Sequence, residues 1–250
     1  MEASDPSNRV RRLRALIFHG AGSSASTAES LLGRLLRLGW EKAVHLTCYE
    51  DRTGDVHRLS AMGQRYLATG CGASSAIGGI SLGAHGVMTT LLRTDPAKWP
   101  RFAVVAMPAW LGPPDRTAQV TLSTGREIAT SGVAETLRRI EAETHPTLRW
   151  IPSTLAADWA QYEPSVLSRA LITAAQQIAP SIDDLRAVRV PTFVIAVTGD
   201  ALHPADVAHL WADALPHSVV VEVELMELAE SGFALPRLID RLTNFVAALR

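Results

Sequence analysis

The chain has only two cysteines, and this shortage excludes two classes of protein. Among its 250 residues, Cys48 and Cys71 stand alone and lack the spacing of a metal site. Two thiols in a chain of this length do not form a disulfide framework, which is typical of small secreted proteins. We therefore expect a reducing compartment and a cytoplasmic protein.

Long apolar runs and an excess of charge of one sign are also missing. No run approaches the roughly 18 apolar residues that span a bilayer, and the apolar stretch at residues 15–18 is too short for the core of a secretion signal. The net charge is −1, with both signs interspersed, so nothing favours nucleic acid or an anionic membrane as partner. We expect a small-molecule substrate, with the oligomeric state left open.

Motifs that hold common cofactors are absent as well. The sequence has no zinc-type cluster, phosphate-binding loop, dinucleotide fingerprint or calcium loop. We therefore expect neither a metal nor an organic cofactor.

Hydrophobic residues make up 47% of the chain and charged residues 20%, which is enough to bury a substantial core. Short apolar runs alternate with amphipathic stretches, as strands buried on both faces alternate with helices. This alternation predicts an α/β fold with a doubly wound, mostly parallel sheet of about six strands. The predicted strands are residues 13–18, 43–48, 75–80, 102–107, 192–198 and 219–225, and the predicted helices are 27–38, 56–67, 83–93, 204–214 and 235–249.

The alternation stops over residues 112–190, where helix-like patterns occur without a convincing strand. We predict a core domain of residues 1–111 and 191–250, with a helical lid inserted after the strand that ends near Met107. Helices are expected at 133–143 and 165–178, with prolines 146, 152, 164 and 180 as breakers. The aromatic residues Trp150, Trp159 and Tyr162 of this region either wall an apolar substrate pocket or fasten the insertion to the core. Trp110, just before the insertion, is a further candidate for the pocket.

A candidate nucleophile follows the third predicted strand, in the run Gly79-Ile80-Ser81-Leu82-Gly83. In a strand-to-helix elbow, the serine stands on a sharp turn with its hydroxyl exposed, and the glycines avoid collisions with neighbouring backbone. The placement of Ser81 between a buried strand and a helix predicts such an elbow.

A candidate oxyanion hole lies in the small-residue loop after the first strand, His19-Gly20-Ala21-Gly22. Acyl transfer needs two N–H donors aimed at the oxygen that becomes negative. The N–H of Leu82 and the N–H of Ala21 are the predicted pair, and we expect His19 to shape the loop.

A candidate acid ends the fifth predicted strand, in the run Gly199-Asp200-Ala201-Leu202-His203-Pro204. Asp200 either orients a catalytic imidazole or only closes a turn and caps the next helix. Pro204 suits the first turn of that helix.

Together, these motifs resemble the α/β-hydrolase superfamily over nearly the whole chain. Short sequence motifs of the chain are similar to those of compact actinobacterial members of that superfamily. The resemblance implies the strand order 2-1-3-4-5-6, Ser81 as nucleophile and Asp200 as acid. It also implies lipase, esterase, thioesterase, peptidase, epoxide hydrolase, dehalogenase or lyase chemistry.

The sequence departs from the family pattern because no histidine follows His217. The family places its catalytic base after the last strand, where this chain reads Met226-Glu227-Leu228-Ala229-Glu230-Ser231-Gly232-Phe233. We predict that His203 is the relocated base; alternatively it is a turn histidine beside Pro204. His85, four residues beyond Ser81, is a second candidate or a packed core residue.

The predicted activity is serine-dependent hydrolysis or transfer of an ester or thioester acyl group on a small apolar substrate, with an atypical triad. Two alternatives stay open at this point. A carboxylate from Glu227 or Glu230 suits a lyase, isomerase or cyclase, or the scaffold is a catalytically inactive ligand-binding protein.

Overall fold

The computed structural model of the protein describes residues 13–40, 43–69 and 74–249. Cys71 lies outside these ranges. Within them, no helix is both long enough and apolar enough to span a bilayer.

Six parallel strands form one sheet in the order β2-β1-β3-β4-β5-β6, which confirms the predicted fold class. Every residue of β3 and β4 is buried, as expected for central strands covered on both faces. At one edge, β2 shows partial exposure along its length. The strands are β1 (Leu13–Phe18), β2 (Val44–Tyr49), β3 (Ser75–Ile80), β4 (Phe102–Ala106), β5 (Thr192–Thr198) and β6 (Ser218–Glu224).

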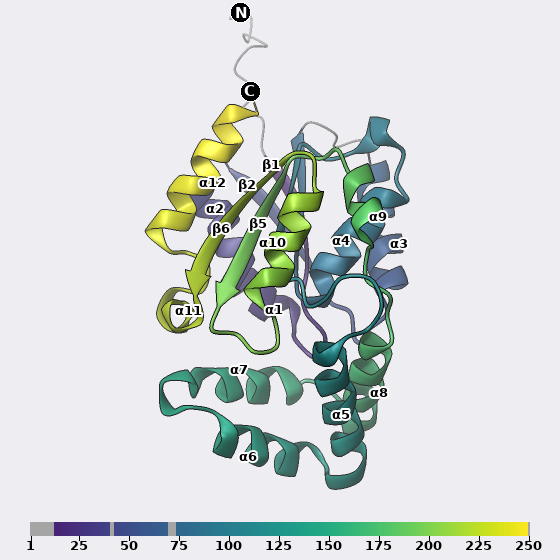
Figure 1. The fold of residues 1–250 in the computed structure, drawn as a ribbon, viewed down its shortest axis with the longest axis vertical. Helices are drawn as coiled ribbons and strands as arrows, with labels where there is room; N and C mark the ends of the chain where they lie inside the picture. The colour runs from purple at the N-terminus through teal and green to yellow at the C-terminus, as the bar shows by residue number, and fades with distance from the viewer. Residues whose placement is uncertain (1–12, 41–42, 70–73, 250) are drawn as a thin grey trace, which may run out of the picture.

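Helices cover both faces of this sheet (Figure 1). One face carries α1 (Ala25–Ala28), the π-helical turn η2 (Glu29–Gly33), α2 (Arg34–Gly39) and α12 (Pro236–Ala248). The other face carries α3 (Val56–Ala68), α4 (Leu82–Leu92), α9 (Ile182–Ala187) and α10 (Ala205–Ala214). Short turns complete the core: η4 (Pro96–Lys98), η6 (Leu225–Glu227) and α11 (Leu228–Ser231).

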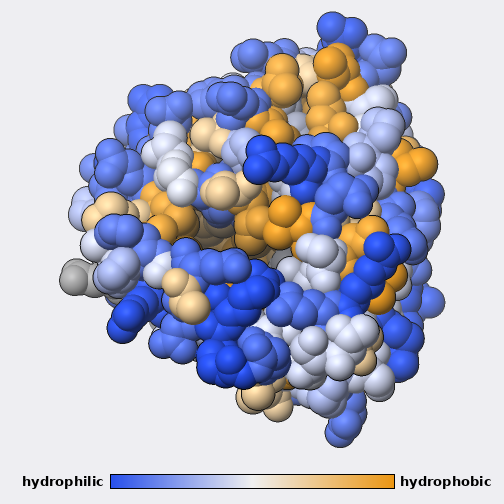
Figure 2. Space-filling model, turned by 60° about the horizontal axis from the view of Figure 1, so that its bottom comes forward, coloured by the Kyte–Doolittle hydropathy of each residue, from blue (hydrophilic) through white to orange (hydrophobic). Residues whose placement is uncertain are grey.

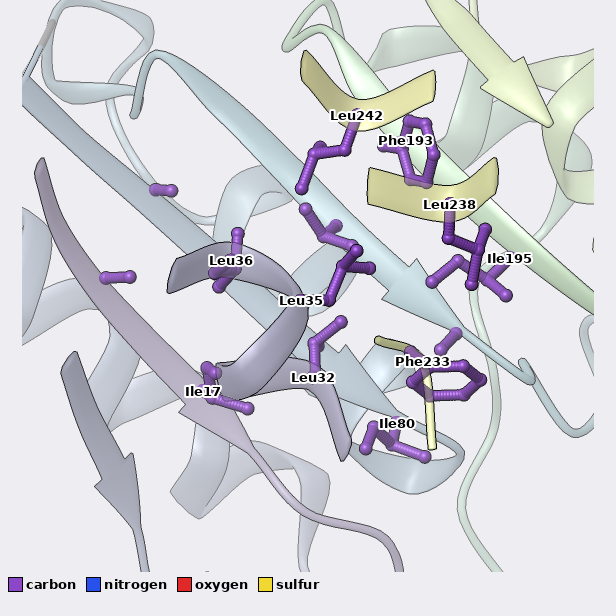
Figure 3. Close-up of a cluster of buried hydrophobic side chains, with 14 of the residues drawn as sticks. Ile17, Leu32, Leu35, Leu36, Ile80, Phe193, Ile195, Phe233, Leu238 and Leu242 are labelled. Carbon is purple, nitrogen blue, oxygen red and sulfur yellow. The ribbon is translucent and has the colours of Figure 1, made fainter. Parts of the chain in front are cut away.

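A continuous apolar cluster joins the first face to its helices (Figure 3). Leu35 and Leu36 of α2 and Leu238 and Leu242 of α12 are almost completely buried over the sheet. Phe193, from β5, is fully buried in the same cluster. Each such side chain contributes about 1.5–3 kcal/mol by leaving water, so this layer holds the strand ends in fixed positions.

Four helices inserted between β4 and β5 lie beyond the carboxyl ends of the strands (Figure 1). They are α5 (Arg116–Ser131), α6 (Val133–Glu143), α7 (Trp150–Trp159) and α8 (Pro164–Ala175), with the turn η5 (Pro146–Leu148) before α7. The division into a core and a lid domain stays a prediction.

One of the predicted breakers was wrong. Pro164 separates α7 from α8 and is the first residue of α8, but Pro152 lies in the first turn of α7. A proline is tolerated there because the first N–H groups of a helix have no intrahelical acceptor.

Candidate active site

Ser81 lies at a strained turn between β3 and α4. Its backbone angles are φ 54° and ψ −119°, which a side-chain-bearing residue rarely adopts. The flanking glycines are required because a Cβ atom on Gly79 would lie 2.2 Å from the Gly83 carbonyl oxygen, and one on Gly83 would lie 2.4 Å from that of Phe18. The Ser81 N–H donates to the Ala106 carbonyl at 3.0 Å, which ties the elbow to β4.

The structure brings Ser81, His203 and Asp200 together in one hydrogen-bonded chain. The Nε2 atom of His203 lies 2.9 Å from Ser81 Oγ, and its Nδ1 atom lies 2.8 Å from Asp200 Oδ2. The side chains of His203 and Asp200 are only 17% and 11% exposed. With the Nδ1 proton directed at the carboxylate, the lone pair of Nε2 faces the serine hydroxyl.

Asp200 also closes the turn that carries His203. Its Oδ1 atom accepts the N–H of Leu202 at 2.8 Å and the N–H of His203 at 3.3 Å. Burial of the Asp200 carboxyl group acts to raise its pKa, but the charge and hydrogen bond of His203, with the two backbone N–H donors, hold the pKa below its ordinary value. The carboxylate is therefore ionised at neutral pH.

The loop after β1 passes directly beside the serine. A Cβ atom on Gly20 would lie 3.3 Å from Ser81 Cβ and 3.8 Å from Ser81 Oγ. His19 is buried beneath this loop, where its Nδ1 atom lies 2.7 Å from the Gly20 carbonyl oxygen and its Nε2 atom accepts the Asp51 N–H at 2.9 Å. His19 therefore supports the loop and makes no contact of this kind with Ser81.

The two predicted oxyanion donors belong to different segments, one to the loop after β1 and one to the start of α4. Within the described part of the chain, neither the Ala21 N–H nor the Leu82 N–H donates to another protein group. Both groups are thus free to bind a substrate oxygen, although their role in stabilising an oxyanion stays a prediction.

His85 lies elsewhere, fully buried between two indole rings. Its ring centroid is 4.7 Å from that of Trp110 and 5.5 Å from that of Trp211, and neither ring nitrogen has a hydrogen-bond partner among the described residues. Burial first, and then the charge of His203, lowers the pKa of His85 to about 3. His203 Nε2 is therefore the imidazole nitrogen that accepts the Ser81 hydroxyl, while His85 is a neutral core residue.

The loop after β6 forms η6 and α11. Glu227 accepts the Glu224 N–H at 2.8 Å and pairs with Arg237 of α12, so its carboxylate is already engaged. The side chain of Glu230 lies outside the part of the structure that is described. In that described part, no three histidine, cysteine or acidic side chains are arranged to share a metal ion.

The four aromatic residues assigned to a substrate pocket have different surroundings. Trp110 is buried and donates from Nε1 to the Gln177 carbonyl at 3.3 Å. Trp159 and Tyr162 belong to a buried cluster of the insertion that packs against Ala21, and Trp150 packs against the core cluster that includes α12. A pocket walled by these rings stays a prediction.

A groove of about 400 Å³ opens where the insertion meets the ends of β5 and β6. Its wall includes Thr198 and Gly199, the two residues that precede Asp200. Figure 2, which brings the insertion end forward, shows a hollow with apolar side chains inside it and hydrophilic residues around it. The groove is lined by His145, Thr147, Leu148, Thr198, Gly199, Glu224, Leu225 and Met226.

One buried carboxylate of the insertion has no counterpart in the sequence-based predictions. Asp158 of α7 is 3% exposed and accepts three hydroxyl groups from the segment that follows the loop after β1. A sequence signal did exist, since Asp158 is the single charged residue of the helix α7 and Ser23, Ser24 and Thr27 form a cluster of hydroxyls. Nothing local in the sequence pairs the two segments, which are about 130 residues apart.

The architecture matches many solved structures, although no family model and no curated protein matches the chain. A carboxylesterase structure from Nitrososphaera gargenis aligns with a TM-score of 0.74 and 14% identity, covering 99% of this chain and 98% of the other. MenH from S. aureus aligns with a TM-score of 0.71 and 13% identity over 95% and 94% of the two chains. An esterase from Rhodococcus sp. aligns with a TM-score of 0.64 and 15% identity over 97% and 93%. The chain therefore has the α/β-hydrolase fold.

Proposed function

We propose that the protein is a serine hydrolase or acyltransferase that acts on an ester or thioester of a small apolar acyl group. One observation carries the proposal: Ser81, on a strained elbow, lies within hydrogen-bond distance of an imidazole whose other nitrogen is bound to a buried carboxylate. A serine hydroxyl is a weak nucleophile until an adjacent base accepts its proton, and this arrangement supplies one.

In the first half of the reaction, Ser81 Oγ attacks the carbonyl carbon while His203 Nε2 accepts the hydroxyl proton. The negative charge that develops on the carbonyl oxygen is bound by the N–H groups of Leu82 and Ala21. When the tetrahedral intermediate collapses, the bond to the leaving group breaks, and His203 gives its proton to the departing alcohol or thiol.

In the second half, His203 accepts a proton from a water molecule or from an acceptor alcohol, which attacks the acyl-enzyme. Collapse of the second intermediate returns the proton to Ser81 Oγ and releases the acid or the new ester. Asp200 stays ionised throughout, and stabilises the imidazolium that forms twice in each cycle.

The groove beside the Asp200 turn supports an apolar substrate portion. Leu148, Leu225 and Met226 give it apolar walls from the insertion and from the segment after β6. The structurally similar protein from Nitrososphaera gargenis is a carboxylesterase, and hydrolysis of a carboxylic ester is the chemistry proposed here.

The two alternatives have less support. A lyase or isomerase that uses a carboxylate after β6 would need that carboxylate free, yet Glu227 is engaged by a backbone N–H and by Arg237. A pure ligand-binding protein has no need for a histidine aligned on Ser81 and Asp200.

Fluorophosphonate labelling combined with hydrolysis of p-nitrophenyl butyrate tests the proposal. Wild-type protein should be labelled at Ser81 and should hydrolyse the ester, while Ser81→Ala and His203→Ala should lose labelling and at least about 10⁴-fold in kcat. His209→Ala removes an exposed histidine paired with Glu222 and should behave as wild type. Wild-type protein that neither labels nor hydrolyses the ester would contradict the proposal.

A further inference from the structure

The position of Ala21 depends on contacts outside its own loop. Gly20 and Gly22 flank it, and Gly22 adopts φ +67°, so the local backbone has unusual rotational freedom. On the Gly20 side, the buried imidazole of His19 is hydrogen-bonded through Nδ1 to the Gly20 carbonyl oxygen at 2.7 Å. A second fixed point is needed beyond Gly22 if the Ala21 N–H is to point in one direction.

The insertion provides that second point through Asp158. Its Oδ2 atom accepts the Ser23 hydroxyl at 2.9 Å, and its Oδ1 atom accepts the hydroxyls of Ser24 at 2.6 Å and Thr27 at 2.8 Å. Bonds to an ionised acceptor are shorter and stronger than bonds between neutral groups. No ion pair to Asp158 occurs among the described residues, so the loop segment itself satisfies the carboxylate.

Two further contacts tie the same segment to the insertion. The Tyr162 hydroxyl donates to the Ser23 carbonyl oxygen at 2.7 Å. Gly22 is covered so closely that an added Cβ atom would lie 3.1 Å from Leu171 Cδ2 and 3.2 Å from Trp159 Nε1. The insertion therefore contacts the loop segment directly at both Gly22 and Ser23.

We propose that Asp158 is a positioning residue for the oxyanion hole: from the insertion, it holds the Ser23–Thr27 segment so that the Ala21 N–H faces the substrate oxygen beside Ser81. This inference rests on the proposed function of Ser81. It makes the inserted helices part of the catalytic geometry, because a displacement of about 1 Å at a reacting group can cost about 100-fold in rate.

The test compares Asp158→Ala with Glu127→Ala. Both variants truncate one carboxylate of the insertion, but Glu127 only pairs with Arg139 between α5 and α6. We expect Asp158→Ala to lower kcat for p-nitrophenyl butyrate by roughly 10- to 100-fold, with KM within about twofold and the midpoint of the pH profile unchanged, because the base is untouched. Glu127→Ala should keep the wild-type kcat.

Hydrogen exchange of the peptide that covers residues 19–24 supplies a readout that needs no activity. This peptide should exchange at least about tenfold faster in Asp158→Ala than in wild type or Glu127→Ala. If Asp158→Ala does not fold, Asp158→Asn keeps the shape, weakens the bonds by removing the charge, and should show smaller changes in the same direction.

The outcomes separate the two proposals. Wild-type protein without labelling or ester hydrolysis overturns the proposed function, and hydrogen exchange then decides whether Asp158 fixes the loop. If wild type is active, an unchanged kcat in the Asp158 variants overturns the positioning role, even if their melting temperature falls. Unchanged exchange over residues 19–24 overturns it in either case.

Discussion

Asp200 and His203 lie three residues apart on a single turn, yet their side chains meet at 2.8 Å between Oδ2 and Nδ1. The turn makes this geometry possible because Asp200 Oδ1 accepts the N–H groups of Leu202 and His203 at the same time. One carboxylate thus both folds the turn and orients the imidazole. The acid and the base of the proposed triad therefore both lie on the turn that follows β5, and the triad uses no residue from the loop after β6.

Replacement of Asp200 by asparagine should therefore remove activity while preserving the turn. The asparagine Oδ1 atom can still accept both backbone N–H groups, but its NH₂ group donates to His203 Nδ1. The imidazole proton is then on Nε2, facing Ser81, and the ring cannot accept the hydroxyl proton. We expect Asp200→Asn to lower kcat for p-nitrophenyl butyrate by about 10³- to 10⁴-fold, as measured by steady-state kinetics.

The control is Asp213→Asn, which makes the same replacement of a carboxylate by an amide at an exposed aspartate of α10. It should retain full activity. Nearly unchanged kcat in Asp200→Asn, with a normal circular dichroism spectrum, would remove Asp200 from the orienting role.

A side chain at position 20 should displace Ser81 or the loop beside it and so lower activity. A methyl group there would lie 3.3 Å from Ser81 Cβ, so either the serine or the loop must shift by a few tenths of an ångström. We expect Gly20→Ala to fold and to lose roughly 10-fold in kcat/KM for p-nitrophenyl acetate. Gly63→Ala is the control for a general loss of stability. It crowds Thr90 in the core and should lower Tm in a thermal melt while kcat stays unchanged. Equal kcat/KM for wild type and Gly20→Ala would show that the loop is not close to the reacting hydroxyl in solution.

The groove should set the preference for acyl chain length. Met226 is half exposed at its wall and Leu148 faces it from η5, so tryptophan at either position should fill part of its 400 Å³. Since each buried CH₂ group contributes about 0.8 kcal/mol, Leu148→Trp and Met226→Trp should lower kcat/KM for an octanoate ester by about 10-fold or more and spare the acetate ester. Val120→Trp, on the exposed face of α5, is the matched control. A loss of the same size for both esters would place the acyl chain elsewhere.

The sequence predicted the sheet well because its signals are local. Strands such as β3 and β5 are short apolar runs bounded by turn residues, and the predicted ranges for both coincide with the observed ones. The elbow was equally readable, since Gly79 and Gly83 are required by contacts within a few residues or with the adjacent strand. The contact of His203 with Ser81 was predicted only as one of several options, because it depends on how the ends of β3 and β5 are placed.

What the sequence could not predict are contacts between segments that only the complete fold brings together. Asp158 accepts a hydrogen bond from Ser24, which lies 134 positions away in the sequence, and no periodicity in either segment predicts this contact. The helices α5 and α7 were not predicted as separate elements; for α7 the reason is that a breaker was expected at Pro152, which occupies a first turn that tolerates proline. The distinction between His85 and His203 likewise needed side-chain burial, because both histidines follow a candidate catalytic residue at helical or turn spacing.

His85 should make the protein less stable in mild acid. Burial lowers its pKa to about 3 in the folded state, against 6.5 in the unfolded chain, so between these values the unfolded state binds one more proton. Stability therefore falls as the pH drops through this window, by about 2 kcal/mol between pH 7 and pH 5 from this group alone. His85→Phe keeps an aromatic ring between Trp110 and Trp211 and has no proton to bind, so its free energy of unfolding should lack this part of the pH dependence. Urea denaturation of both proteins at pH 7 and pH 5 measures the difference, and parallel losses in the two proteins would mean that His85 takes up its proton in the folded state as readily as in the unfolded one.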